Sequence, residues 1–144
     1  MKMLVISFHF APYLSAESLV GFKLLNNLNM DIDVIFASLP YNKIDDKIMD
    51  GSKISLYEID YKSEENTSFI NKIISKVNWF YKSFLKIKRL IKNQDYDFIH
   101  SRSMPMESHF LGYVIKKIHP ELTWVVSFSD PWYNSPYNKQ NKFK

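Results

Sequence analysis

The stretch KMLVISF, Lys2–Phe8, is a nearly continuous apolar run. A strand that is covered on both faces of a parallel sheet has this pattern, whereas a half-exposed strand alternates apolar and polar residues. The run is too short to cross a membrane or to form the core of a signal peptide, and His9 and Pro12 follow it in place of a small-residue cleavage site. We therefore expect a buried strand in a chain that is neither secreted nor membrane-spanning.

The rest of the chain alternates strands with helices. Further strands are predicted over 33–37, 54–59, 96–100 and 123–128, and helices are predicted to begin near Ser15, Thr67 and Pro105. This alternation, with right-handed crossovers, predicts an open, mostly parallel, Rossmann-like α/β sheet with flanking helices. Because 144 residues is the length of one domain, we assign 1–144 to a single unit.

Each predicted helix repeats apolar residues at helical spacing, and we expect these stripes to face the sheet. In chain order they are Val20, Leu24, Leu25 and Leu28; Ile70, Ile73, Val77, Phe80, Phe84, Ile87 and Ile91; and Leu111, Val114, Ile115 and Ile118. Gly21 lies beside the first stripe, where the absence of a side chain permits a close approach to the sheet.

The composition is that of an ordered globular protein, with 46% hydrophobic, 16% aromatic and 24% charged residues. The chain has no cysteine, which excludes disulfides and thiolate metal sites and fits a reducing compartment. A cytoplasmic location is therefore expected.

Positive charge is concentrated in one predicted helix. The segment 66–94 holds six Lys and one Arg with no acidic residue, so it carries +7 and the rest of the chain −3. Two interpretations of helix 67–92 remain open: a solvated face over a core-packed stripe, or a surface that docks on an anionic membrane and displays Trp79 and Tyr81 among its lysines. Nucleic acid is not an expected partner, because no RNA-binding signature accompanies the basic residues.

Polar residues follow three of the predicted strands, in the stretches 9–15, 100–103 and 129–132. Ligands of open α/β sheets bind beyond the carboxyl ends of the strands. Since parallel strands end at a common edge, we expect these three stretches to converge there and to form the binding site.

The chemistry of these stretches suggests particular roles. Arg102 can hold a phosphate or a carboxylate with two hydrogen bonds, and His100 can donate to a sugar hydroxyl. Asp130 can act as a general base or orient a hydroxyl nucleophile, with Trp132 as a wall for a sugar or a lipid. The alternatives are structural: a capped connection in the first stretch, a histidine satisfied by its neighbours, and a turn built on Asp130.

No metal site is expected. Two Asp-x-Asp pairs, at 31/33 and 95/97, precede strands and should lie at the amino edge, opposite the ligand side. His109 and His119 have no partner at a ligand spacing, so we expect them to have packing or surface roles.

Three stretches together, MKMLVISFHFAPYLSAES, YDFIHSRS and WVVSFSDPW, resemble the N-terminal half of glycosyltransferase family 4. The resemblance implies one half of a GT-B enzyme, in which two Rossmann-like halves face a cleft. The N-terminal half holds the acceptor, the C-terminal half holds the nucleotide-sugar, and the sugar is transferred with retention of configuration. It implies neither a bound metal nor a cofactor, because the nucleotide-sugar is a substrate.

The resemblance also assigns site residues. The loop 12–17 would border the acceptor and the donor phosphate, 100–103 would line the cleft, and Asp130 would activate the acceptor. The residues expected to contact substrate are His9, Pro12, Tyr13, Ser15, Ala16, Glu17, His100, Ser101, Arg102, Ser103, Ser129 and Trp132. The family commonly has adjacent glycines where this chain has Ser15, Ala16 and Glu17, so contact of this loop with a phosphate is in question.

The donor-binding half of the family carries a Glu-x7-Glu pattern, and no two glutamates of this chain are eight positions apart. The resemblance therefore implies an acceptor-binding half that is inactive alone and acts with a C-terminal half or a separate donor-binding subunit. The implied acceptor is a glycan or a lipid-linked compound, as in cell-surface polysaccharide synthesis. A non-catalytic scaffold that binds a membrane or a partner is the alternative.

Overall fold

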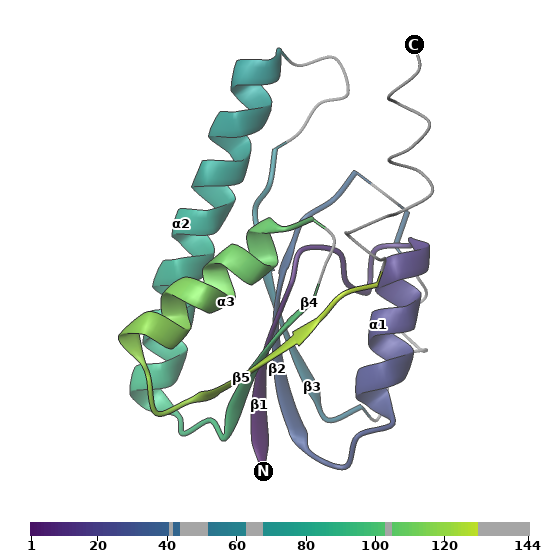
Figure 1. Ribbon diagram of the computed structural model, residues 1–144. Coiled ribbons are helices and arrows are strands. Elements are labelled where there is room, and N and C mark those ends of the chain that lie inside the picture. The colour runs from purple at the N-terminus through teal and green to yellow at the C-terminus, as the bar shows by residue number, and fades with distance from the viewer. Residues whose placement is uncertain (41, 44–51, 63–67, 103–104, 130–144) are drawn as a thin grey trace, which may run out of the picture.

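A computed structural model describes residues 1–40, 42–43, 52–62, 68–102 and 105–129 (Figure 1). The strands in these ranges are β1 (Lys2–Ser7), β2 (Asp31–Ala37), β3 (Ile54–Ile59), β4 (Phe98–Arg102) and β5 (Thr123–Ser127), and the helices are α1 (Ala16–Asn26), α2 (Phe69–Asn93) and α3 (Glu107–Ile118). None of these helices is long and apolar enough to cross a membrane.

The strands form one five-stranded sheet in the order β3-β2-β1-β4-β5, and every neighbouring pair is parallel. The predicted Rossmann-like α/β architecture is confirmed. β1 occupies the centre, and Leu4, Val5 and Ile6 are completely buried. The continuous apolar run at 2–8 therefore has the expected cause, since both faces of this strand are covered.

The helices form a layer on each face of the sheet (Figure 1). Gly21 of α1 lies against Arg102, and Gly112 of α3 lies against Ser101, its neighbour in β4. Because successive side chains of a strand point to opposite faces, α1 and α3 cover opposite sides. α2 packs beside α3. A Cβ at either glycine would lie 3.2 Å from a side-chain atom of β4, so both positions favour the absence of a side chain.

The predicted inner stripe of α1 is wrong except for Leu25. Val20 and Leu24 are exposed, as is Leu28, whereas the buried face is Ser18, Gly21, Phe22 and Leu25. The small residues Ser18 and Gly21 allow the helix to rest closely on the sheet, so they, and not the larger aliphatic residues, face inward. Ile118, at the end of α3, is likewise exposed instead of inward-facing.

The stripe predicted for the longest helix is correct only in its second half. Ile87 is buried, and Phe80, Phe84 and Ile91 pack against the core, but Ile70, Ile73 and Val77 are exposed. Figure 1 shows the reason: the first turns of α2 rise past the ends of the strands, where no sheet lies beneath them.

The membrane-docking interpretation of helix 67–92 placed Trp79 on the surface among the lysines, and the structure contradicts that detail. Trp79 is fully buried, and its ring packs edge-on against Phe8 with the ring centroids 4.8 Å apart. Tyr81 is exposed as expected.

Candidate functional site

The ends of β1, β4 and β5 lie side by side. Ser7 pairs in register with Arg102, and Arg102 pairs with Ser127, so the three strands finish at the same level of the sheet. The polar stretches after them therefore begin at one edge, as the sequence predicted. This carboxyl edge is where ligands of such sheets bind.

One carboxylate joins these strand ends. Oε1 of Glu17, in the first turn of α1, accepts hydrogen bonds from Nη2 of Arg102 at 3.2 Å and from Oγ of Ser129 at 2.7 Å. The Arg102 side chain is 5% exposed and that of Glu17 is 24% exposed. We call Glu17, Arg102 and Ser129 the carboxyl-edge cluster.

The local sequence explains the position of Glu17. Ser15 caps α1, since its Oγ accepts from the backbone N–H of Ser18 at 3.1 Å. Glu17 thus sits at the positive end of the helix dipole. One turn later, a Cβ on Gly21 would lie 3.2 Å from Cζ of Arg102, so the lack of a side chain lets α1 approach the guanidinium closely.

Glu17 does not satisfy all the donors of Arg102. Among the residues that the structure describes, Nε and Nη1 of Arg102 are buried without a hydrogen-bond partner. A buried donor left without a partner costs about 1–3 kcal/mol. The cluster therefore holds two buried guanidinium donors that no described residue satisfies, while Glu17 balances the charge of Arg102.

His100 is buried beside the cluster and already has a partner. Its Nε2 lies 2.8 Å from Oγ of Ser127. Burial, followed by the positive charges of Arg102 and His109, lowers the pKa of His100 to about 4. At neutral pH the ring is uncharged and its Nε2 is engaged by Ser127, which is the structural role that the sequence left open.

Ser101 lies on the other face of the sheet, under α3. Its Oγ is 2.9 Å from Nδ1 of His109 and accepts from Nε1 of Trp124, also at 2.9 Å. This differs from the expected position in the cleft, because β4 continues to Arg102 instead of ending at His100, and strand alternation turns Ser101 away.

The first loop divides into a buried part and an accessible part. Pro12 and Tyr13 are buried, and the Tyr13 hydroxyl donates to Glu58 at 2.6 Å, far from the cluster in the sheet order. Burial and the Glu58 carboxylate raise the pKa of Tyr13 to about 12. These two residues thus support the loop, and their expected contacts with substrate remain predictions.

The accessible part of the loop stays near the cluster. Ser15 and His9 are half-buried and Ala16 is exposed. Burial lowers the pKa of His9, and the negative charge of Glu17 opposes that effect, which places His9 within the electrostatic reach of the cluster.

Ser103, Asp130 and Trp132 lie outside the described residues. The catalytic role of Asp130 and the substrate contacts of the other two therefore remain predictions. Within the described ranges, no group of three or more His, Asp or Glu residues is arranged to hold a metal ion.

Sequence reasoning missed the residues that brace this edge. Oγ of Ser108 accepts from the backbone N–H of Phe8 at 3.0 Å, which fixes the end of β1 to α3. Oγ of Ser7 donates to the carbonyl of His9 at 2.8 Å. No pattern in the sequence marks Ser127 as the neighbour of Arg102 or Ser108 as the partner of Phe8.

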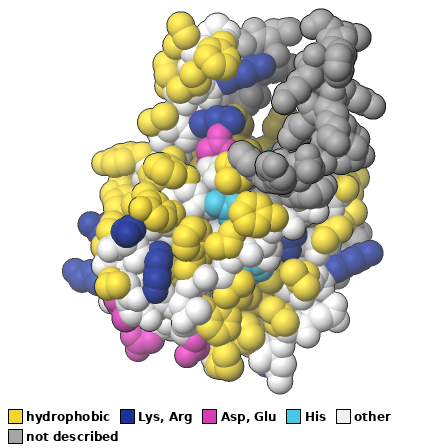
Figure 2. Space-filling model, viewed as in Figure 1, with side chains coloured by type: hydrophobic (Ala, Val, Ile, Leu, Met, Phe, Trp, Pro, Cys, Tyr) yellow, Lys and Arg dark blue, Asp and Glu magenta, His cyan; other side chains and the backbone are white. Residues whose placement is uncertain are grey.

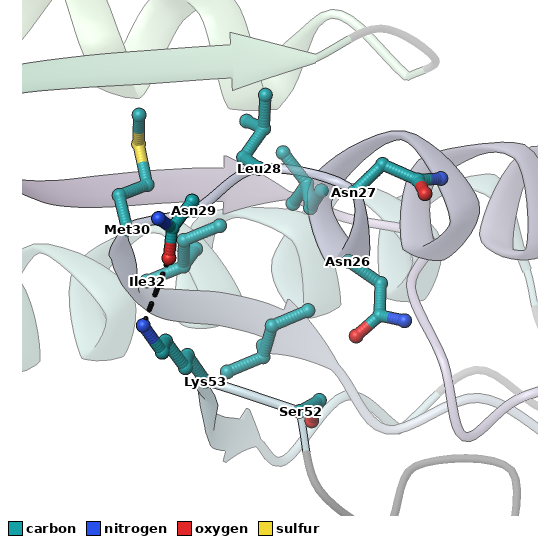
Figure 3. Close-up of a pocket in the computed structure, with 10 residues that line it drawn as sticks. Asn26, Asn27, Leu28, Asn29, Met30, Ile32, Ser52 and Lys53 are labelled. Carbon is teal, nitrogen blue, oxygen red and sulfur yellow. Dashed lines mark hydrogen bonds between the residues drawn. The ribbon is translucent and has the colours of Figure 1, made fainter.

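A distinct pocket lies at the opposite, amino edge of the sheet, between the end of α1 and the start of β3. Its lining residues are Leu25, Asn26, Asn27, Leu28, Asn29, Met30, Ile32, Ser52, Lys53 and Ile54. Nζ of Lys53 donates a hydrogen bond to Oδ1 of Asn29 at 2.9 Å, as Figure 3 shows. This pocket shares no residue with the carboxyl-edge cluster.

Comparison with known proteins supports the fold. No protein-family model and no curated sequence matches the chain. Among solved structures, a C-terminal domain of the PF1911 hydrogenase from Pyrococcus furiosus is similar, with a TM-score of 0.60, 11% identity and coverage of 88% of this chain and 90% of that chain.

A glycosyltransferase shares the same fold. UGT2 of Phytolacca americana, solved with UDP-2fluoro-glucose and pterostilbene, has a TM-score of 0.59 at 8% identity. The match covers 91% of this chain and 31% of UGT2, so the chain spans about a third of that enzyme. At such identities the similarity establishes a Rossmann-like fold that a hydrogenase domain and a glycosyltransferase have in common.

Proposed function

We propose that this chain is the acceptor-binding half of a retaining glycosyltransferase of family 4. The complete enzyme would transfer a sugar from a nucleotide-sugar to a glycan or lipid-linked acceptor in cell-surface polysaccharide synthesis. The observation that carries the proposal is the carboxyl-edge cluster, in which Glu17 links Arg102 and Ser129 at the ligand edge of the sheet. The resemblance of the three sequence stretches and the fold shared with UGT2 support it.

The cluster suits an acceptor with hydroxyl and phosphate groups. Nε and Nη1 of Arg102 are buried, so they would donate to a phosphate after a shift of the groups that cover them. The second oxygen of the Glu17 carboxylate would accept from a sugar hydroxyl. His9 lines the same edge. Asp130, one residue after Ser129, would then orient or deprotonate the attacking hydroxyl.

The pairing of Glu17 with Arg102 also affects whether the first loop, which lacks the adjacent glycines of the family, can lie near a phosphate. An isolated Glu17 carboxylate would repel a donor phosphate, but the guanidinium at 3.2 Å offsets its charge. Glu17 is therefore compatible with a phosphate-bearing substrate. Recognition of the nucleotide-sugar itself would fall mainly to the donor-binding half.

The test combines this chain with its donor-binding half, either as one polypeptide or as two subunits, and measures sugar transfer across a panel of nucleotide-sugars. We expect Asp130→Ala to lower kcat by about 10²–10⁴-fold. Lys53→Ala, in the amino-edge pocket, is the matched control and should leave transfer unchanged. Full transfer by Asp130→Ala would remove its catalytic role, and inactivity with every donor would overturn the enzyme assignment.

A non-catalytic scaffold is the second candidate, and one observation favours it. Arg102 is almost fully buried and already paired with Glu17, as in a structural ion pair. The two candidates differ in ligand binding by the isolated chain. Ligand-observed NMR with phosphorylated sugars should show binding that Arg102→Met abolishes if the chain is an acceptor half, and none if it is a scaffold.

A further inference from the structure

The outer face of α2 carries an apolar stripe that nothing in the described chain covers. Residues spaced by three and four positions lie on one side of a helix. On this side, in order from the start of α2, are Ile70, Ile74, Val77, Tyr81, Leu85, Lys88 and Lys92, which we call the outer α2 stripe. Its first five members are apolar or aromatic, with exposures between 38% and 67%, and its last two are exposed lysines.

The apolar part of the stripe belongs to a wider surface. Ile73, Ile74, Val77 and Tyr81 line a shallow apolar hollow along the helix. Phe110 of α3 is 62% exposed, and the centroids of its ring and the Phe80 ring are 5.6 Å apart. Figure 2 shows hydrophobic side chains over the upper part of α2 and continuing onto α3.

This surface lies at the same edge as the carboxyl-edge cluster. β3 ends at the carboxyl edge and β4 begins at the amino edge, so α2, which connects them, runs antiparallel to the strands. The first half of α2 therefore projects beyond the edge at which Glu17 and Arg102 meet, as Figure 1 shows.

All the charged residues of α2 are positive. α2 contains six Lys and one Arg and no acidic residue. Lys76 pairs with Glu107 at 2.5 Å and Lys82 with Asp60 at 3.3 Å. On α2, the exposed cations without a carboxylate partner among the described residues are Lys72, Lys88, Arg89 and Lys92.

We infer that the outer α2 stripe docks on an anionic membrane surface. Its apolar half would enter the headgroup boundary, and Lys88 and Lys92 would lie against lipid phosphates. A second copy of the chain fits this face less well, because each α2 carries the same net positive charge and pairing would bury the two lysines. The displayed aromatic residue is Tyr81, since Trp79 belongs to the core.

The docking does not depend on the proposed activity, but its role in delivering an acceptor rests on the proposed function. A bilayer bound at the first half of α2 would lie next to the carboxyl edge. Arg102 faces α1, on the other side of the sheet from α2. A lipid-linked acceptor whose chain remains in the membrane would therefore have to extend over the carboxyl edge to bring its polar head to Arg102.

Vesicle flotation of the purified chain tests the inference. We expect binding to vesicles of phosphatidylcholine mixed with phosphatidylglycerol at low salt, and weaker binding at high salt. Ile74→Ser and Val77→Ser should each lower the partition coefficient roughly tenfold, and Lys88→Gln and Lys92→Gln about fivefold each. Val20→Ser and Leu24→Ser on α1 are the matched controls, because both side chains are exposed and apolar, and they should change nothing.

Three outcomes would overturn the inference: no binding to the mixed vesicles at low salt, equal binding to pure phosphatidylcholine, or a dimer in sedimentation that Val77→Ser dissociates. The assay contains neither nucleotide-sugar nor acceptor, so its result is independent of transfer. Conversely, transfer to a water-soluble acceptor tests the proposed function without a membrane. The failure of either can thus be told from the failure of the other.

Discussion

Each edge of the sheet contains a buried charged residue, but the two residues differ in how completely protein groups satisfy their hydrogen bonds. At the amino edge, Asp33 is 2% exposed, lies 3.1 Å from Nζ of Lys2 and accepts a hydrogen bond from the Tyr96 hydroxyl. At the carboxyl edge, Arg102 pairs with Glu17, yet two of its guanidinium nitrogens have no partner in the described part of the chain.

The difference separates a structural clamp from a binding site. The amino-edge group ties the starts of β1 and β2 to the turn before β4, and Nζ of Lys2 also contacts the side chain of Gln94. Protein groups on several sides meet its carboxylate. The carboxyl-edge cluster contains two buried donors that no described residue satisfies, at the edge where parallel sheets bind ligands, so we assign the ion pair there to function.

The largest effect that this comparison predicts is the loss of the amino-edge clamp. Asp33→Ala leaves the Lys2 ammonium and the Tyr96 hydroxyl without their shared acceptor. Breaking a buried pair in this way costs about 3–5 kcal/mol, and we take the lower end because Lys2 is partly exposed. Urea unfolding measures the change in free energy. Asp31→Ala, an exposed carboxylate on the same strand, is the control and should stay within about 0.5 kcal/mol.

An effect of comparable size should appear when the pH is lowered. The unfolded chain binds a proton at His100 near pH 6.5, whereas the folded chain does so only near pH 4. The stability contributed by neutral His100 is therefore complete above pH 6.5 and is lost as the pH falls to about 4, a change of about 3 kcal/mol.

His100→Asn keeps a polar partner for Ser127 and removes this titration. Its unfolding free energy should fall less between pH 6.5 and 4 than that of the parent chain. Part of the slope should remain, because burial also lowers the pKa values of His9 and His109. Parallel pH profiles for the two proteins would contradict the assignment.

The fold could be read from the sequence because β1 and its neighbours are buried on both faces. Such strands appear as short, continuous apolar runs, and here these runs alternate with longer segments of helical periodicity. The inner face of α1 could not, since it depends on Ser18 and Gly21, whose small size carries no hydrophobic signal. Trp79 and Phe80 are adjacent large aromatics, and only the packing around Phe8 determines which of them enters the core.

The sequence predicted at which edge of the sheet the candidate site lies, but not which side chains contact one another there. Parallel strands place Glu17 and Arg102 on one rim, whereas their hydrogen bond depends on how closely α1 rests on Arg102. An error of two residues in the end of β4 was enough to place Ser101 in the cleft, because alternation reverses the face at each residue. Strand ends are where periodicity carries least information.

The smallest change in stability, and the sharpest test of the comparison, is expected at Glu17. Glu17→Gln keeps an acceptor for Arg102 and Ser129, so unfolding should cost only about 1 kcal/mol less than in the parent chain. Because the competing negative charge is gone, pyrophosphate should bind roughly tenfold more tightly by isothermal titration calorimetry, as expected when an opposing charge near a buried guanidinium is removed. Ser15→Ala, which removes only the helix cap, is the control and should not raise this affinity. A destabilisation as large as that of Asp33→Ala, with no gain in anion binding, would mean that both edges are clamps, since the free donors of Arg102 would then have no ligand to meet.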